Sequence, residues 1–172
     1  MASELRVNTI AHSNGTSAVT INSSGQISPK LKTSFVLVYA QGSSSYNTVS
    51  TGSYLPLNAV YQSKGTGSSD FSTTTYKYTA PVNGIYNISL NLITNSSSTS
   101  SHFNLDVDGT PQYVFTWSAS REGNSTVNHY LNAGEVVGFK SANTSGYYRH
   151  SDSLPSGSHY TFGSFHLVEE IV

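Results

Sequence analysis

The sequence predicts an all-β protein, a sandwich or barrel of short antiparallel strands. Nowhere do apolar residues repeat at the three- and four-residue spacing of a helix, and Gly, Ser, Thr and Asn interrupt every window. Short runs rich in Val, Ile, Tyr and Phe are instead separated by Gly, Ser, Asn and Pro turns at near-even spacing. Only 36% of the residues are hydrophobic, but 12% are aromatic, which is enough for a packed β core.

The strands are expected from residue 34 onward, with no helix between them. The run from Gly84 to Thr94 is the clearest, because Ile88, Leu90 and Leu92 alternate with polar residues, as in a half-buried strand. The chain length of 172 residues suits one such domain with a short appendage. The predicted strands cover residues 35–39, 55–61, 75–79, 84–94, 102–107, 113–118, 125–132, 135–142 and 160–169.

The first 32 residues differ from the rest and form a predicted segment of their own, before a domain at 33–172. Short apolar runs are separated by Asn14-Gly15 and Ser24-Gly25, which are good turn residues. Each run is too short to form a buried core by itself, so the segment is either a loose tail or a stalk completed by the same segment of other chains. The expected docking residues are Leu5, Val7, Ile10, Val19 and Ile21.

Composition excludes several classes of function. Eight basic and 9 acidic side chains leave a net charge of -1, so there is no electrostatic footprint for nucleic acid. Cysteine is absent, which excludes disulfides. No apolar run approaches the roughly 20 residues of a membrane span, and Met1 to Arg6 lack the apolar stretch of a signal peptide. We therefore expect no membrane insertion and synthesis in a cytoplasm, whereas the uncharged polar surface is usual outside cells. A virion part made in an infected cell reconciles the two.

No catalytic motif is present, and the chain is not expected to be an enzyme. The sequence has no Gly-x-Ser-x-Gly elbow, no phosphate-binding Gly-rich loop and no His-Glu-x-x-His. Asp106 and Asp108 could form a carboxylate pair for glycoside hydrolysis or Ca²⁺, but Asp108-Gly109-Thr110-Pro111 is a turn sequence, which favours a structural role.

Metal binding is a weaker alternative, and no cofactor is expected. Histidines could supply one ligand per chain around a symmetry axis, although scattered strand histidines are more often hydrogen-bonded or exposed. Ca²⁺ at the far end would have only Asp152 and Glu122 nearby. The histidines in question are His102, His129, His150, His159 and His166.

A family resemblance covers about residues 33–172. The run Phe71, Tyr78, Ala80-Pro81, Gly84, Tyr86, Ile88 and Leu90 resembles the signature of the complement-one-q globular heads, relatives of tumour necrosis factor. Two further stretches are similar to family motifs: Leu131, Gly134, Glu135 and Val137, and the closing run from Phe162 to Leu167. Thr66, Val60, Ile88 and the order Gly163-Ser164 depart from the pattern. The resemblance implies a jelly roll of about ten strands that assembles as a homotrimer, with both ends of the domain together.

Strand alternation then brings three loops to the end opposite the termini, namely residues 95–101, 119–124 and 143–158. The last has sixteen residues, and loops longer than roughly 12 to 15 residues are usually functional or disordered. Aromatic rings beside an arginine can stack on sugar rings and hold an anionic group. Alternatively, Tyr147 and Tyr148 point inward and Trp117 belongs to the core. The candidate receptor-binding residues are Tyr147, Tyr148, Arg149, His150, Asp152, Arg121 and Trp117.

The run from Leu5 to Ile10, followed by Ala18 to Ile21, is similar to a motif near the amino ends of phage tail and fibre proteins. Together the two resemblances imply a virion structural protein, the head of a phage tail fibre or appendage. Its expected partners are two further copies of itself, another virion protein, and a host-surface glycan or protein. The alternatives are a trimerisation, decoration or connector protein of the particle without a receptor of its own, and a depolymerase.

Overall fold

The computed structural model describes residues 9–11, 17–21, 27–29, 32–42, 46–93, 101–117, 122–142, 146–149 and 161–171. The chain divides into two compact units, Met1–Lys32 and Thr33–Val172, which we call the N-terminal unit and the head. Among the described residues, no helix is both long and apolar enough to cross a membrane.

The N-terminal unit contains a three-stranded antiparallel sheet in the order β1-β2-β3. Its strands are β1 (Thr9–Ala11), β2 (Ser17–Ile21) and β3 (Ile27–Pro29). The register pairs Ile10 with Val19 and Ile21 with Ile27, so the short apolar runs lie on neighbouring strands. The predicted turns Asn14-Gly15 and Ser24-Gly25 lie outside the described residues, as do Leu5 and Val7.

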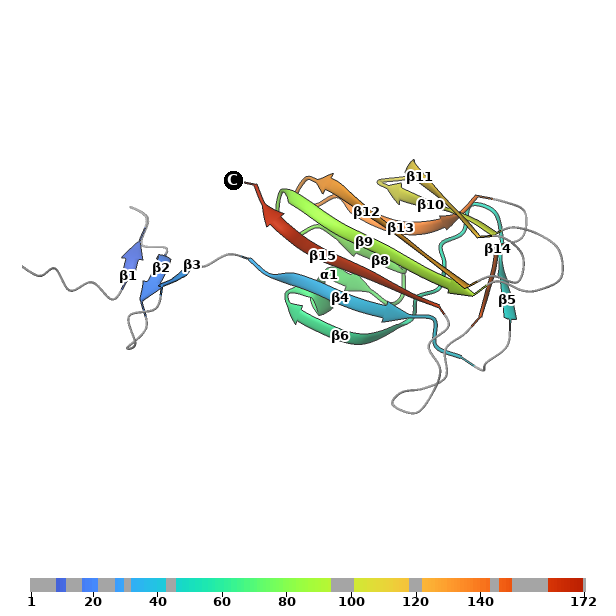
Figure 1. Cartoon of the computed structure of the whole chain (residues 1–172), viewed down its shortest axis with the longest axis horizontal. Helices are drawn as coiled ribbons and strands as arrows, with labels where there is room; N and C mark the ends of the chain where they lie inside the picture. The colour runs from blue at the N-terminus through green and yellow to red at the C-terminus, as the bar shows by residue number, and fades with distance from the viewer. Residues whose placement is uncertain are drawn as a thin grey trace, which may run out of the picture. The chain divides into compact units, whose positions relative to one another are not determined.

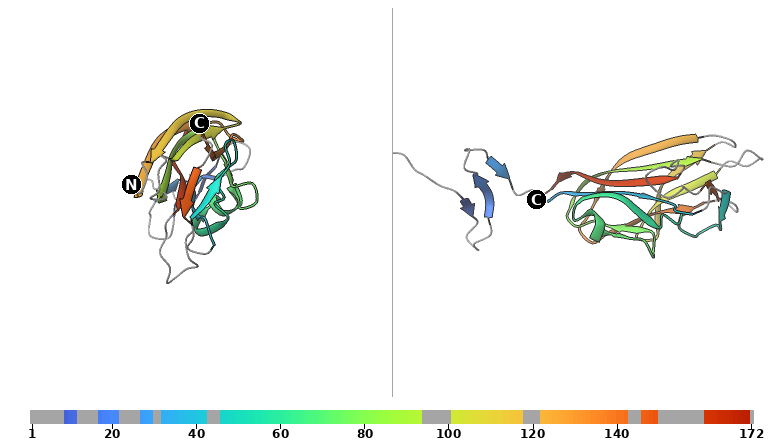
Figure 2. Two further views of the ribbon diagram at one scale, coloured as in Figure 1. Left: turned by 90° about the vertical axis from the view of Figure 1, so that its right-hand side faces the viewer. Right: turned by 90° about the horizontal axis from the view of Figure 1, so that it is seen from below.

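The head is a sandwich of two five-stranded antiparallel sheets (Figure 1). The first sheet has the order β12-β9-β15-β4-β6 and the second has the order β11-β10-β13-β8-β7. Figure 2 shows β4 and β15 side by side. The two strands are antiparallel, so the start of β4 and the end of β15 lie at the same end of the sheet. The first sheet comprises β4 (Ser34–Tyr39), β6 (Ala59–Gly65), β9 (Gly84–Ile93), β12 (Glu122–Leu131) and β15 (Phe162–Glu170). The second comprises β7 (Phe71–Ser72), β8 (Lys77–Thr79), β10 (Ser101–Val107), β11 (Thr110–Trp117) and β13 (Val136–Ser141).

The core lies between the two sheets, and aromatic rings join them. Phe165 of β15 stacks on Tyr78 of β8, with ring centroids 5.0 Å apart, and lies 5.6 Å from Phe139 of β13. The Tyr86 hydroxyl donates a hydrogen bond to the Val82 carbonyl at 2.8 Å, which satisfies a polar group that burial would otherwise penalise. The aromatic residues of the predicted family signature are therefore core residues.

The all-β sandwich predicted from the sequence is confirmed, and its two five-stranded sheets match the expected ten strands. The prediction of a strand at 55–61 was wrong in position, because Leu55 and Leu57 are buried in an irregular segment and β6 begins at Ala59. The strand expected at 75–79 begins at Lys77, since Tyr76 has a positive φ of 62° and closes a turn. The short helix α1 (Gly67–Asp70) and strand β7 were not predicted.

Two further strands, β5 (Tyr46–Val49) and β14 (Gly146–Arg149), pair with each other at the end of the head away from its termini (Figure 1). We call this pair the far-end ribbon. The prediction that residues 143–158 form one continuous loop was therefore wrong. Gly-Tyr-Tyr-Arg has no alternation of apolar and polar residues, and its strand is defined only by pairing with a segment about one hundred positions away.

Candidate functional site

The first sheet has one face against the core and one face directed away from it, which we call the open face. The core face carries Val36, Val38, Ile88 and Phe165, all fully buried. Because side chains alternate along a strand, the residues between these lie on the open face. Cross-strand register arranges them in three rows: Asn124, Asn91, Phe162 and Tyr39; Thr126, Ser89, Ser164, Leu37 and Gln62; Asn128, Asn87, His166, Phe35 and Lys64.

The centre of the open face is polar but uncharged. Ser89 and Ser164 share a hydrogen bond of 2.7 Å, and the Asn87 amide donates to Asn128 Oδ1 at 2.8 Å. The His166 ring lies edge-on to Phe35, with centroids 5.6 Å apart. Among the described residues of these rows, Lys64 on the edge strand β6 is the one side chain that carries a full charge at neutral pH.

Apolar side chains lie at both ends of the open face. A hollow of about 110 Å³ is lined by Leu37, Tyr39, Tyr61 and Phe162. Tyr61 is 52% exposed although it lies beside these apolar neighbours. Toward the other end, Ile85 pairs with Tyr130 on one side and with the exposed Glu169 on the other, and both Tyr130 and Val168 are exposed. Exposed aromatic and aliphatic groups around an uncharged centre are typical of a surface that is covered in an assembly.

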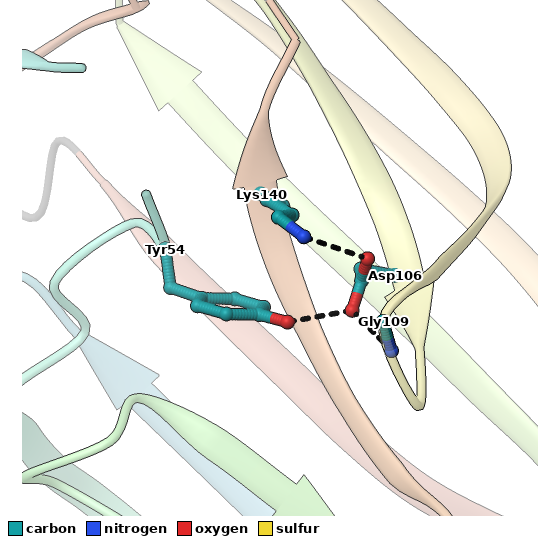
Figure 3. A network of polar contacts seen from close by, with 4 residues as sticks. All are labelled: Tyr54, Asp106, Gly109 and Lys140. Atoms are coloured by element: carbon teal, nitrogen blue, oxygen red, sulfur yellow. Dashed lines mark hydrogen bonds and ion pairs between the residues drawn. The ribbon is translucent and has the colours of Figure 1, made fainter. Parts of the chain in front are cut away.

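The outer face of the second sheet carries a polar network centred on Asp106, which is 1% exposed (Figure 3). Asp106 Oδ1 accepts hydrogen bonds from the Tyr54 hydroxyl at 2.6 Å and from the Gly109 amide at 3.0 Å. Asp106 Oδ2 lies 3.5 Å from Lys140 Nζ. The Lys77 ammonium lies 4.1 Å from the centroid of the Tyr54 ring. Sequence reasoning missed Tyr54, because its partner is fifty-two positions away.

The structural interpretation of Asp106 and Asp108 is supported by this geometry. Asp108 has a positive φ of 48° in the turn between β10 and β11, and its Oδ1 accepts a hydrogen bond from the Val136 amide at 2.9 Å. Each carboxylate thus accepts hydrogen bonds from nearby backbone amides or side chains, as turn aspartates commonly do.

The predicted receptor residues are only partly within the described structure. Tyr147, Tyr148 and Arg149 occupy consecutive positions of β14, opposite Thr48, Asn47 and Tyr46 of β5. Trp117 is the last residue of β11 and pairs with Ser101. Within the second sheet, register places the end of β11, the start of β10 and the end of β13 on the same side, since Ser101 pairs with Trp117 and Phe103 pairs with Ser141. Arg121, His150 and Asp152 lie outside the described residues.

The histidines are spread over different surfaces. His102 Nδ1 lies 3.1 Å from Thr116 Oγ1, and the His129 ring lies edge-on to Tyr113 at 5.5 Å. His150 and His159, like the calcium candidate Asp152, lie outside the described residues. Within the described part of the chain, no three His, Asp or Glu side chains gather in a way that could hold a metal ion.

Three tyrosines make the stability of the head depend on pH in the alkaline range. Burial, followed by the neighbouring Asp106, raises the pKa of Tyr54 to about 12, and burial also raises the pKa of Tyr78 and Tyr86. The unfolded chain releases these protons near pH 10, earlier than the folded one, so stability falls as pH rises from about 10 to 12. We expect the urea midpoint to drop across this range and to drop less in Tyr78→Phe. An equal drop in both proteins would contradict the role of Tyr78.

Three solved structures illustrate the likeness of the head to known folds. A TNF, Eiger from S. frugiperda, is 10% identical, with a TM-score of 0.56 over 83% of this chain and 96% of that one. The globular domain of zebrafish complement 1qA is 15% identical, with a TM-score of 0.54 over 81% of this chain and 100% of that one. The vertex protein P5 of PRD1 is 16% identical, with a TM-score of 0.53 over 81% and 99%.

No family model matches the chain, and no curated protein matches it significantly. The likeness is therefore one of fold, and it confirms the predicted jelly roll of the TNF and complement-one-q type for the head.

Proposed function

We propose that the chain is a non-enzymatic virion protein whose head self-associates through the open face as a homotrimer. The observation that carries this proposal is the open face itself, where exposed apolar groups surround a centre without full charges. Depletion of charge with enrichment of aromatic residues is typical of the buried core of an interface. In the homotrimer that the family resemblance implies, the open face of each of the three copies would be covered.

A closed ring of three copies needs two different surfaces on each copy, because its contacts are head-to-tail. The head offers both. The hollow beside Tyr61 lies at the β6 edge of the first sheet, whereas Tyr113, 40% exposed, lies on β11 at the edge of the second sheet. A volume of about 110 Å³ is below the roughly 150 Å³ of a cavity that holds benzene. It therefore suits one apolar side chain of a neighbouring copy.

Light scattering after size-exclusion chromatography is the direct test of self-association. The wild-type chain is expected at about 55 kDa, three times its mass of 18.4 kDa. Leu37→Asp places an unpaired charge in the hollow and is expected to give a folded monomer, because desolvating that charge costs several kcal/mol. Thr74→Asp, at an exposed site in the turn between β7 and β8, is the matched control and should remain trimeric. A monomeric wild type at micromolar concentration would contradict the proposal.

The virion role has two supports. The name of PRD1 P5 describes a vertex protein with this fold, and the N-terminal run is similar to a motif of phage tail and fibre proteins. We assign docking onto the particle to the N-terminal unit, through Leu5, Val7, Ile10, Val19 and Ile21. We assign receptor contact, to a surface glycan or protein, to the far end of the head. There the ribbon carries Tyr147, Tyr148 and Arg149, with Trp117 at the end of β11 and with Arg121, His150 and Asp152 close in sequence to these strands.

Replacing Tyr148 and Arg149 together by alanine is expected to remove binding to host cells without lowering the melting temperature. An aromatic ring with a guanidinium supplies stacking and a bidentate anion contact, which alanine cannot replace. Three weak sites per trimer act together, so the loss of avidity should exceed tenfold. The measurement is retention of labelled protein on a panel of bacterial strains, scored on a strain that retains the wild type. Unchanged retention would favour the alternative, a connector or decoration protein without a receptor.

A further inference from the structure

The far-end ribbon is joined to the sandwich through a short segment, residues 50–55, that runs along β13. The Gly52 amide donates to the Ser141 carbonyl at 2.8 Å, and the Ser141 amide donates to the Ser53 carbonyl at 2.9 Å. The Leu55 amide donates to the Phe139 carbonyl at 2.8 Å. This segment therefore pairs with the part of β13 that follows the residues paired with β8. It also fixes the backbone next to the end of β5 and a few residues before the start of β14.

Side chains hold this segment at three points. Val49, 5% exposed, and Leu55, 1% exposed, anchor its two ends in the core. Between them, residues 50–53 are exposed, and Tyr54 is the only side chain of the stretch 50–54 that is partly buried. Tyr54 forms an isolated β-bridge with Lys140, so its position along β13 is set by the backbone as well.

The Tyr54 side chain is held from several sides. Its hydroxyl donates to the buried carboxylate of Asp106 at 2.6 Å, as Figure 3 shows. A hydrogen bond to a charged acceptor is roughly twice as strong as a neutral one, and leaving that acceptor short of donors is costly. A Cβ at Gly138 would lie 2.8 Å from Tyr54 Cδ1, so glycine lets the ring lie against β13. Lys77 and Lys140 place their ammonium groups 4.1 Å and 5.6 Å from the ring centroid.

We infer that Tyr54 is a positioning residue for the far-end ribbon, and that its hydrogen bond to Asp106 holds β5 and β14 in place against the body of the head. The inference rests on the proposed function only for its consequence, which is that residues 147–149 are presented to a receptor in one fixed geometry. An ordered ribbon loses less conformational entropy on binding, so fixing it raises affinity without adding a contact.

The test is hydrogen–deuterium exchange on the full chain, which reports local opening. In Tyr54→Phe, peptides covering 46–55 and 141–149 are expected to exchange at least tenfold faster, while those of β4 and β15 keep wild-type rates. Tyr54→Ala should enlarge the same local effect. Tyr76→Phe is the matched control, because Tyr76 donates to the Ser72 carbonyl through its backbone amide, which the substitution keeps, and it should change nothing. Asp106→Asn, which keeps an acceptor oxygen but loses the charge, should give an intermediate rate.

Unchanged exchange of the ribbon in both Tyr54 variants would overturn the inference. A uniform rise over all strands would overturn it as well, because it would show a purely global loss of stability. Cell retention measured on Tyr54→Phe separates the inference from the proposed function. A loosened ribbon with reduced retention supports both. A loosened ribbon with normal retention leaves the positioning role standing and contradicts the receptor role of the ribbon.

Discussion

Replacement of Phe165 by alanine is expected to lower the free energy of unfolding by about 3 to 5 kcal/mol, as large-to-small changes of buried aromatic residues do. Phe165 is fully buried in β15 and contacts rings of the opposite sheet. Its ring is parallel to Tyr78 within 5° and also lies 5.8 Å from Phe71. Removing it leaves a cavity between the sheets that neither backbone can close, because each is held by its own ladder of hydrogen bonds.

The measurement is urea unfolding followed by tryptophan and tyrosine fluorescence. Val114→Ala is the control, since Val114 is 62% exposed on β11 and should change stability by less than about 0.5 kcal/mol. A loss below about 1 kcal/mol for Phe165→Ala would show that the sandwich collapses around the missing ring. Tyr78 would then not be held in the position described.

Replacement of Gly67 by alanine is expected to cost about 3 kcal/mol or more, at the upper end of the overpacking range. Gly67 opens helix α1, and a Cβ there would lie 1.9 Å from the Phe35 carbonyl oxygen. That atom belongs to the backbone of β4, so no side-chain rotation can relieve the clash. The helix must move away from β4, which would disturb the hydrogen bonds of Asp70 with Ser34 and Thr66, both 2.6 Å long.

Gly109→Ala provides the matched control for this change. Gly109 has a positive φ of 86°, but a Cβ there would meet nothing within 4 Å. Its cost is therefore limited to the strain of a left-handed residue, roughly 1 to 2 kcal/mol. Both midpoints can be compared in the same urea series. Equal losses in the two variants would mean that close approach of α1 to β4 contributes nothing to the cost.

Much of the fold could be predicted from the chain itself because a strand has a period of two that needs no partner to be visible. In β9, Tyr86, Ile88 and Leu90 are buried and alternate with partly exposed residues, as the sequence indicated. The Asp108-Gly109 turn was likewise predictable, since both residues tolerate the positive φ they adopt. Elements without periodicity were missed, such as β7 with two residues and α1 with four.

The candidate site shows the same division. Composition and turn chemistry predicted an all-β domain with few surface charges, and the family resemblance singled out Phe71, Tyr78 and Tyr86, which the structure places in the core. Only the tertiary structure decided that Leu37, Tyr61 and Phe162 line one hollow, that β5 and β14 pair, and that Tyr54 reaches Asp106. Each of these contacts joins residues far apart in sequence, and a local pattern contains no information about which distant strand will be its neighbour. Sheet order supplies that information, because it sets which side chains share a face and which backbone edges remain to be paired.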